Sequence, residues 1–425
     1  MDIKGLIDSL KTCPCGRRHF VEIKAVEIGR GLTQKCGEIL AQNGFPRRIL
    51  VVADTNSLSA SNGVVDVLKS ANFDLKLKVF DSFRHPTQEN VAIIEGLTHD
   101  VDGILSIGTG SINDVCRRAA LTMDKEFAIL ATAPSMDGFA SGTAPIIENG
   151  MKDTLPAQQP SVIIADTDVL AASPTHLKAA GFGDVIGKFI ALVDWRVANL
   201  LVNEYYCENI ANLVRDALAR MISIADKVIK NDAETAGFVM ESLVLTGIAM
   251  RLAECSRPAS GAEHQISHYV GMKQLADGIT SDYHGKKVGV ATLALVKAYN
   301  KLSKIIPQFC QDKAKIEEVI ACYGERQRDF ITSQNKPSIV EQFSVQKLEE
   351  LWPEIQKIIA EELPSYEFLT DVMKSAGAAT TFEEIGVDKD LKNEALTVHS
   401  FMRRKVVLTR LLFLTDQNVT KLVND

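Results

Sequence analysis

Short apolar runs alternate with amphipathic stretches in the first part of the chain. Each run is bounded by turn residues, which is typical of buried parallel strands. The stretches between them carry apolar residues at helical spacing, as in the segment that begins at Pro86-Thr87 and continues through Val91 and Ile94. Strands and helices in this alternation predict a doubly wound α/β domain. The predicted strands are Arg48–Ala53, Leu75–Phe80 (which alternates with lysine and so suits a sheet edge), Gly103–Ile107 and Phe127–Thr132.

The pattern changes near residue 166, where long helical periodicities replace strand signals. We place a domain boundary near Ala165–Ser173, with a dinucleotide-binding α/β domain at 1–168 and an all-α domain at 169–425. The apolar run Phe238–Met250 is too short to span a bilayer and is interrupted by Glu241, so we predict a buried helix. Ser344–Glu362 and Ser400–Thr415 are predicted to be amphipathic helices that pack against the core.

Composition is ordinary for a globular enzyme of two domains. The 425 residues are 46% hydrophobic and 24% charged. A net charge of −7 argues against nucleic-acid binding. The amino terminus has no basic segment followed by an apolar run, so we expect no signal peptide and a cytoplasmic location. The eight cysteines are accordingly expected to be reduced thiols.

One cysteine pair near the amino terminus resembles part of a metal site. Cys13-Pro14-Cys15-Gly16, with His19 following, has the spacing of half a zinc knuckle. No second Cys pair in the sequence completes it, so a zinc site is not the favoured interpretation at this point.

Three of the eight histidines fall between Ser256 and His284. Ser260-Gly261 indicates a helix start, after which His264 and His268 lie four residues apart and so face one side of a helix. His284 begins the next apolar helix. This grouping favours a metal or proton-transfer site about as strongly as it favours structural histidines. It is not a metalloprotease motif, because Gln265 stands where the general base would be.

Polar residues follow several predicted strands. Gly108-Thr109-Gly110-Ser111 joins a strand to a helix and offers backbone N–H groups to a phosphate, although a tight turn explains the glycines equally well. Asp54 ends an earlier strand and suits a ribose diol, or equally a helix cap. Asp137 lies after another strand, at the edge where open α/β sheets bind ligands.

A glycine-dense segment, Gly181–Lys188, interrupts the helical half. Interior glycines cost roughly 1 kcal/mol each in a helix, so close approach of a ligand or another backbone is expected there. Asp184 is the carboxylate placed to join the histidines. One Asp and two His would leave a coordination position open, as in catalytic zinc sites.

Taken together, these motifs resemble the sn-glycerol-1-phosphate dehydrogenase family, a branch of the superfamily of glycerol dehydrogenases, iron-type alcohol dehydrogenases and dehydroquinate synthases. The resemblance spans about 48–296, and its most specific part favours the phosphate-using branch. In chain order the motifs are G-T-G-S-I-N-D, T-A-P-S-M-D-G, G-F-G-D-V-I-G-K, S-R-P-A-S-G-A-E-H-Q-I-S-H and H-G-K-K-V-G.

The resemblance assigns roles position by position. It implies metal ligands at Asp184, His264 and His284, and substrate contacts at Asp137, Asp184 and His268. Of these, His268 and Asp137 are the expected catalytic residues. The implied dinucleotide contacts are Asp54, Gly110, Ser111, Ile112, Asn113, Asp114, Thr132, Ala133, Pro134, Ser135 and Ser141.

The implied activity is interconversion of dihydroxyacetone phosphate and sn-glycerol 1-phosphate by metal-assisted hydride transfer. NAD is the expected cofactor, with NADP as the alternative; zinc is the expected metal, with nickel or iron as alternatives. The rivals are a metal-dependent glycerol dehydrogenase with unphosphorylated substrate, and a nucleotide sensor without turnover. We expect a homo-oligomer, a dimer or larger. Four cations lie near the site motifs in the sequence, and most of them are expected to be solvated surface charges: Lys188, Arg257, Lys286 and Lys287.

Overall fold

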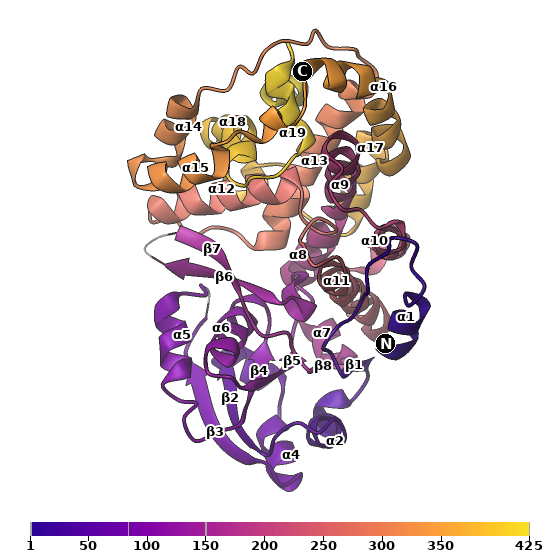
Figure 1. The fold of residues 1–425 in the computed structure, drawn as a ribbon. Coiled ribbons are helices and arrows are strands. Elements are labelled where there is room, and N and C mark those ends of the chain that lie inside the picture. Colours follow the sequence, from indigo (N-terminus) through magenta and orange to yellow (C-terminus); the bar gives the residue numbers. More distant parts are fainter. Residues whose placement is uncertain (1, 84, 149–150, 425) are drawn as a thin grey trace.

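A six-stranded parallel sheet organises the first half of the protein, and helices make up the second half (Figure 1). The computed structural model describes residues 2–83, 85–148 and 151–424. The strand order is β1-β8-β5-β4-β2-β3, and β6 pairs with β7 in a separate antiparallel hairpin. The strands are β1 Ala25–Gly29, β2 Arg48–Asp54, β3 Asp74–Phe80, β4 Gly103–Gly108, β5 Glu126–Ala131, β6 Thr143–Glu148, β7 Met151–Pro156 and β8 Val162–Asp166.

The helices alternate with the strands up to β8 and then continue alone. Those of the first half are α1 Ile3–Ser9, α2 Cys36–Gln42, α3 Thr55–Ala60, α4 Val64–Ser70, α5 Gln88–Glu95 and α6 Gly110–Thr122. Those that follow are α7 Thr167–Ala172, α8 Thr175–Ile186, α9 Lys188–Val202, α10 Glu208–Ser223, α11 Ala233–Ala253, α12 Ala262–Ala276, α13 His284–Leu302, α14 Ile316–Tyr323, α15 Arg328–Asn335, α16 Val345–Glu362, α17 Tyr366–Ser375, α18 Lys389–Val398, α19 Leu408–Leu411 and α20 Val419–Asn424.

The central strands β2, β4 and β5 are buried on both faces because the sheet is covered on both sides. In β2, Leu50 and Val52 enter the larger core, which also contains residues of α5 and α6. Ile49 and Val51 point the other way, into a smaller core that α2 and α4 complete. This burial confirms the doubly wound α/β architecture. The edge position predicted for Leu75–Phe80 is also confirmed, since this segment forms β3, which ends the sheet.

Several elements differ from the prediction. β1, β8 and the β6–β7 hairpin were not predicted. The predicted helix over Ser400–Thr415 is wrong: α19 spans only four residues, between short 3-10 turns at His399–Phe401 and Leu412–Leu414. The other predicted tail helix, Ser344–Glu362, is confirmed as α16.

In the described part of the chain one helix, α11, is long and apolar enough to cross a membrane. Its central side chains, among them Val239, Leu243 and Ile248, are buried against the rest of the protein. Contacts with α10, α7 and α8 surround it. The helix is therefore a core helix, as its interruption by Glu241 indicated.

Helices α8 and α13 approach each other at backbone contact. A Cβ added to Gly285 at the start of α13 would lie 2.0 Å from the carbonyl oxygen of Ala180 in α8, and one added to Gly181 would lie 1.9 Å from that of Pro134. Any side chain at either position would separate these segments. The close backbone approach predicted from the glycine density is thus confirmed, and it brings Asp184 beside His284.

The amino-terminal residues pack on the helical half. The loop after α1 contacts α10 and α11. His19 Nδ1 is 2.9 Å from the carbonyl oxygen of Leu252 in α11, and Asn209 Nδ2 of α10 is 3.4 Å from Cys13 Sγ. The proposed limits of the two domains, 1–168 and 169–425, stay a prediction.

Candidate active site

A cavity of about 1140 Å³ opens at the carboxyl ends of the central strands. The sheet order reverses between β2 and β4, because the chain proceeds from β2 outward to β3 and from β4 outward to β5. Such switch points are where doubly wound sheets bind ligands. Asp54 at the end of β2 and Gly108 at the end of β4 both line the cavity, and the opposite wall includes His268, His284 and other residues of the helical half.

The glycine turn after β4 places the amino terminus of α6 at this cavity. Thr109 caps the helix in extended conformation, and its hydroxyl lies 2.6 Å from that of Ser135 in the turn after β5. This contact joins the two turns. Backbone N–H groups and the positive end of the helix dipole face the cavity, an arrangement suited to a phosphate.

Asp54 both caps a helix and lines the cavity. Its Oδ1 accepts a hydrogen bond from the backbone N–H of Ser57 at 2.7 Å, and the backbone N–H of Asp54 donates to the Ser57 hydroxyl oxygen at 3.0 Å. This reciprocal capping box fixes the carboxylate at the strand end. The two interpretations of Asp54 from the sequence are therefore compatible in one position.

The residues expected to bind dinucleotide divide into two groups. Those that line the cavity are Asp54, Gly110, Ser111, Ile112, Thr132, Ala133 and Ser135. Within the described residues, the cavity lining does not include Asn113, Asp114, Pro134 and Ser141. Asn113 is buried and accepts a hydrogen bond from Ser106 at 2.8 Å, which ties α6 to β4.

Asp184, His264 and His284 come together from three different helices. Asp184 Oδ1 is 3.6 Å from His264 Nε2 and 3.8 Å from His284 Nε2, and all three donor atoms lie within 4.8 Å of one another. Asp184 and His264 are buried, whereas the His284 side chain is 28% exposed and reaches the cavity. The open side of this triad therefore faces the cavity.

Contacts around the triad orient each donor toward a common point. The backbone N–H of Asp137 donates to Asp184 Oδ2 at 2.9 Å, which leaves Oδ1 facing the histidines. His264 Nδ1 donates to Glu263 Oε1 at 2.6 Å, and His284 Nδ1 is 3.4 Å from the Ser267 hydroxyl. A ring nitrogen engaged in this way leaves Nε2 available to a metal, the arrangement usual for histidine ligands.

This donor set fits a divalent metal. One carboxylate oxygen and two imidazole nitrogens suit zinc, nickel or iron. Glu263 is fully buried beside His264, which would be costly for an unpaired carboxylate unless positive charge lies nearby. The three protein donors leave room for a substrate oxygen on the cavity side.

The start of α12, and with it His264, is held by Asp194 of α9. Asp194 Oδ2 accepts the N–H of Ala262 at 2.8 Å, and its Oδ1 accepts the N–H of Leu408 at 2.9 Å. Burial raises the pKa of Asp194 to about 7. The helix start predicted at this point is confirmed, but Asp194 and Glu263 supply the capping contacts.

Lys188 was expected among surface charges, and that interpretation is wrong. Its side chain is fully buried, with Nζ 2.6 Å from Asp137 Oδ2 and 3.4 Å from Asp184 Oδ1. Burial acts to lower the pKa of Lys188, but the two carboxylates outweigh it and raise that pKa. Burial, followed by the charge of Asp184, raises the pKa of Asp137. Lys188 therefore links Asp137 to the triad.

Two of the other cations near the site motifs, Arg257 and Lys287, are also buried, whereas Lys286 is partly exposed. Arg257 is buried and pairs with Glu204 while donating to the carbonyl of Val406 at 2.7 Å. Lys287 is largely buried, lines the cavity, and donates to the Ser281 hydroxyl. Lys286 pairs with Asp282 at 3.1 Å.

His268 lines the cavity one helical turn after His264. Its ring centroid is 5.5 Å from that of His284 and 6.3 Å from that of His264. The three histidines are thus neighbours, with His268 on the cavity side of the triad. Within the described residues, His268 is not one of the three grouped donors.

Comparisons with known proteins identify relatives of this chain. A family model described as iron-containing alcohol dehydrogenase matches residues 27–174. A glycerol-1-phosphate dehydrogenase [NAD(P)+] from Bacillus velezensis is 34% identical over 402 residues, covering 92% of each chain. The corresponding protein from Halalkalibacterium halodurans is 34% identical over 322 residues, covering 74% of this chain and 80% of its own.

Solved structures share the fold at much lower identity. A probable glycerol dehydrogenase from Sinorhizobium meliloti superimposes with a TM-score of 0.65 at 16% identity, covering 95% of this chain and 96% of its own. Glycerol dehydrogenase from Schizosaccharomyces pombe gives a TM-score of 0.56 at 17% identity, covering 86% and 94%. At such identities the likeness concerns the fold alone.

Proposed function

The chain belongs to the glycerol-1-phosphate dehydrogenase family, and we propose on that basis that it interconverts dihydroxyacetone phosphate and sn-glycerol 1-phosphate with NAD(P). The observation that carries the proposal is the meeting of Asp184, His264 and His284 at a cavity whose other wall is the sheet switch point. A dinucleotide and a small ketone then fit on opposite sides of one space.

The proposed metal ligands are Asp184, His264 and His284. A divalent metal bound there supplies Lewis-acid polarisation of the substrate carbonyl, worth several kcal/mol in the transition state. The family implies a metal; zinc is our proposal for its identity, from the oxygen-and-two-nitrogen donor set. The hydrogen bonds from Glu263 and Ser267 hold the two imidazoles in the required orientation.

His268 is the proposed proton donor for ketone reduction. A bound NAD(P)H would supply hydride to the ketone, and the carbonyl oxygen would then require a proton. His268 lies on the cavity side of the triad without belonging to it, so it is placed to donate that proton. A positioned imidazole contributes typically about 10²–10⁴-fold to such a step. Asp137 forms an ion pair with Lys188, with Oδ2 2.6 Å from Nζ. We propose that Asp137 contacts the substrate near the reacting carbon.

NAD is the proposed preferred cofactor. The Asp54 carboxylate, fixed at the end of β2 by its capping contacts, would accept hydrogen bonds from a ribose diol and repel a 2′-phosphate. The turn residues Gly110 and Ser111 would receive the pyrophosphate at the amino terminus of α6. Comparison of kcat/KM for NADH and NADPH in wild type and Asp54→Ala tests this. A ratio left unmoved by the variant would remove Asp54 as the selector.

Lys287 is the proposed contact for the substrate phosphate. It lies in the first turn of α13, one turn from His284, and lines the cavity. A phosphate bound there provides binding energy remote from the reacting carbon, and this energy positions the carbonyl and raises kcat. The alternative, a glycerol dehydrogenase acting on unphosphorylated substrate, would make no use of such a cation.

The deciding experiment measures NADH oxidation with dihydroxyacetone phosphate and with dihydroxyacetone. We expect kcat/KM to favour the phosphorylated ketone by at least about 10²-fold. Lys287→Ala should reduce activity on the phosphorylated ketone and leave the slow reaction of dihydroxyacetone nearly unchanged. Equal turnover of both ketones would establish the glycerol dehydrogenase alternative, and no turnover of either would favour a nucleotide sensor.

The stereochemistry of the product is a separate test. We expect sn-glycerol 1-phosphate, which an sn-3-specific glycerol-phosphate dehydrogenase cannot oxidise. Oxidation of the product by that enzyme would contradict the proposed substrate stereochemistry. A homo-oligomeric assembly and a cytoplasmic location complete the proposal, and light scattering and cell fractionation measure them.

A further inference from the structure

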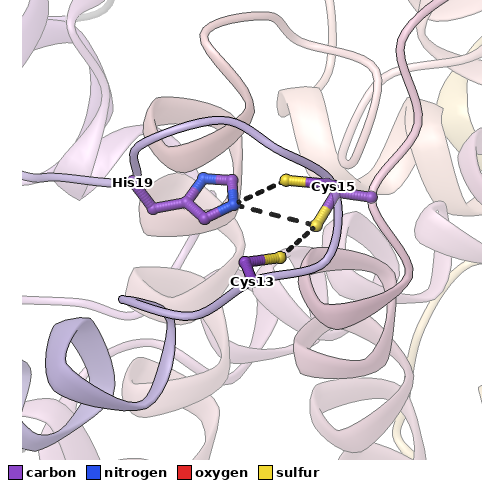
Figure 2. A group of neighbouring side chains, drawn as sticks. Cys13, Cys15 and His19 are labelled. Atoms are coloured by element: carbon purple, nitrogen blue, oxygen red, sulfur yellow. Dashed lines mark hydrogen bonds between the residues drawn. The ribbon is translucent and has the colours of Figure 1, made fainter.

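Four side chains of the types that bind metals form a second group, separate from Asp184, His264 and His284, which we call the cleft triad. Cys13, Cys15 and His19 come from the loop after α1, and Cys207 is the residue before α10. Their donor atoms all lie within 4.8 Å of one another. Figure 2 shows the side chains of Cys13, Cys15 and His19 turned toward one another, with dashed contacts from the His19 ring to sulfur atoms. Within the described residues, none of the four lines the cleft.

Three of the six separations between these donors are close to those of a tetrahedral site. Cys13 Sγ is 3.4 Å from Cys207 Sγ, and His19 Nε2 is 3.1 Å from Cys15 Sγ and 3.9 Å from Cys207 Sγ. Donors bound to one zinc ion at about 2.3 Å for sulfur and about 2.0 Å for nitrogen lie about 3.4–3.8 Å apart. Small adjustments of these side chains would therefore bring all four to a common centre.

Neighbouring groups support each donor. His19 Nδ1 is 2.9 Å from the carbonyl oxygen of Leu252, so Nδ1 carries the proton and the Nε2 lone pair faces the sulfurs. The Tyr205 hydroxyl donates to Cys15 Sγ, and Asn209 Nδ2 donates to Cys13 Sγ, each at 3.4 Å. Donors aimed at sulfur stabilise thiolates, the form that binds metal.

The loop itself is shaped for this convergence. Gly16 has φ +77°, a left-handed conformation that glycine adopts without strain, and its N–H is 3.3 Å from the carbonyl oxygen of Cys13. The turn places both cysteines of the Cys-Pro-Cys-Gly sequence on the side facing His19. Cys207, missing from the local motif, comes from the helical half and supplies the fourth donor.

Two simpler explanations account for only part of this arrangement of four side chains. Cysteines are often buried as small apolar residues, but His19 is only 5% exposed and directs a polar nitrogen at two sulfurs. A disulfide between Cys13 and Cys207 would use two of the four side chains and leave the approach of Cys15 to His19 unexplained. A metal ion uses all four.

We propose that Cys13, Cys15, His19 and Cys207 form a structural zinc centre that fastens the amino-terminal segment to the helical half. Three thiolates and one imidazole are the soft donors that select zinc, and four protein ligands leave no position for substrate. Binding releases the protons of the three thiols, so zinc affinity rises with pH. The ion joins positions separated by almost two hundred residues of chain.

The first test is the zinc content of the full-length protein, measured by mass spectrometry after purification without chelator. We expect two metal ions per chain, one of them zinc lost in Cys13→Ser, Cys15→Ser and Cys207→Ser. Cys310→Ser, at a half-buried cysteine outside the cluster, is the matched control and should retain both ions. His264→Ala should lose only the other ion. Unchanged metal content in the three cluster variants would overturn the proposal.

The second test needs no variant. Growth in cobalt-supplemented medium places Co²⁺ in the cluster, and its thiolates are expected to give intense sulfur-to-cobalt charge-transfer absorption that the cleft triad, which has no sulfur, cannot produce. Absence of that band in protein that contains two cobalt ions per chain would overturn the proposal. So would a Cys13–Cys207 disulfide peptide recovered from protein digested without reductant.

Discussion

The cleft triad and the amino-terminal cysteine cluster gather metal donors in opposite ways. Asp184, His264 and His284 project from three packed helices, and the backbone contact between α8 and α13 fixes their separation. The cluster takes three of its donors from a loop and one from a helix end. The packing of helices therefore sets the geometry of the first site, whereas the second site joins a loop to a helix end that lies far away in the sequence. Loss of metal from the cleft triad should abolish catalysis. Loss of metal from the cysteine cluster should weaken the attachment of the amino-terminal segment to the helical half.

The largest expected effect separates these two roles. His264→Ala removes a proposed ligand and should lower kcat/KM by at least about 10³-fold, because Lewis-acid stabilisation of the transition state supplies several kcal/mol. Its melting temperature should change little. Cys13→Ser should do the reverse, lowering the melting temperature while leaving kcat near wild type. Steady-state kinetics and calorimetry on both variants measure this, and the opposite pattern would contradict the comparison.

A second variant separates metal binding from proton transfer inside the cleft. His268→Ala should retain the cleft metal and lose roughly 10²–10⁴-fold in kcat, since His268 is placed beside the triad without belonging to it. The pH profile of kcat should lose the limb that His268 contributes. His99→Ala, at an exposed histidine, serves as the control. Loss of metal from the His268 variant would make it a ligand and refute the assignment.

A third variant tests whether packing sets the geometry of the triad. Gly285→Ala places a Cβ against the Ala180 carbonyl and should force α13 away from α8, at a cost of about 1–3 kcal/mol in stability. The cleft metal should bind more weakly while the cluster zinc is retained. Gly29→Ala, where the added Cβ meets only Leu32 at ordinary contact distance, is the matched control. Equal metal affinity in both variants would count against preorganisation by packing.

The last prediction concerns the pH dependence of stability and Asp194, which holds the start of α12. Because burial raises the pKa of Asp194 to about 7, the folded chain keeps a proton that the unfolded chain releases near pH 4. The unfolding free energy should therefore fall between about pH 4 and pH 7, by about 1.4 kcal/mol per pH unit for this one proton. Asp194→Asn should remove that contribution. Denaturant titrations across this range measure the slope, and an identical slope in wild type and variant would show that Asp194 does not cause it.

Sequence patterns predicted the central sheet well because its strands are buried on both faces. β2, β4 and β5 form continuous apolar runs, and such runs need no tertiary information to identify. β8 has an equally clear run, Val162–Asp166, and lay within reach of the same reasoning. β1 gives a weaker signal, since it is short and its central Glu27 is exposed. The segment after Ser400 failed because apolar residues held in short turns resemble an amphipathic helix.

Neighbouring site residues could be predicted where they lie close together in the sequence, at a spacing that puts them on one face of a helix. His264 and His268 share a helix face, so their proximity follows from the sequence alone. Cys207 could not be joined to Cys13 in this way, because that contact depends on how the amino-terminal loop packs on α10. The position of Lys188 was similarly hidden, although it begins an almost wholly buried helix, which is itself a signal against a surface charge.

The buried position of Lys188 also affects the charge balance around the proposed metal ligands. Asp137, Asp184 and Glu263 contribute three carboxylates to the interior, and Lys188 contributes one ammonium group. These carboxylates outnumber the ammonium group beside them, so a cation held by Asp184, His264 and His284 would reduce the negative charge of the interior. The charge of the surroundings would then favour metal binding in addition to the donor chemistry that selects the element.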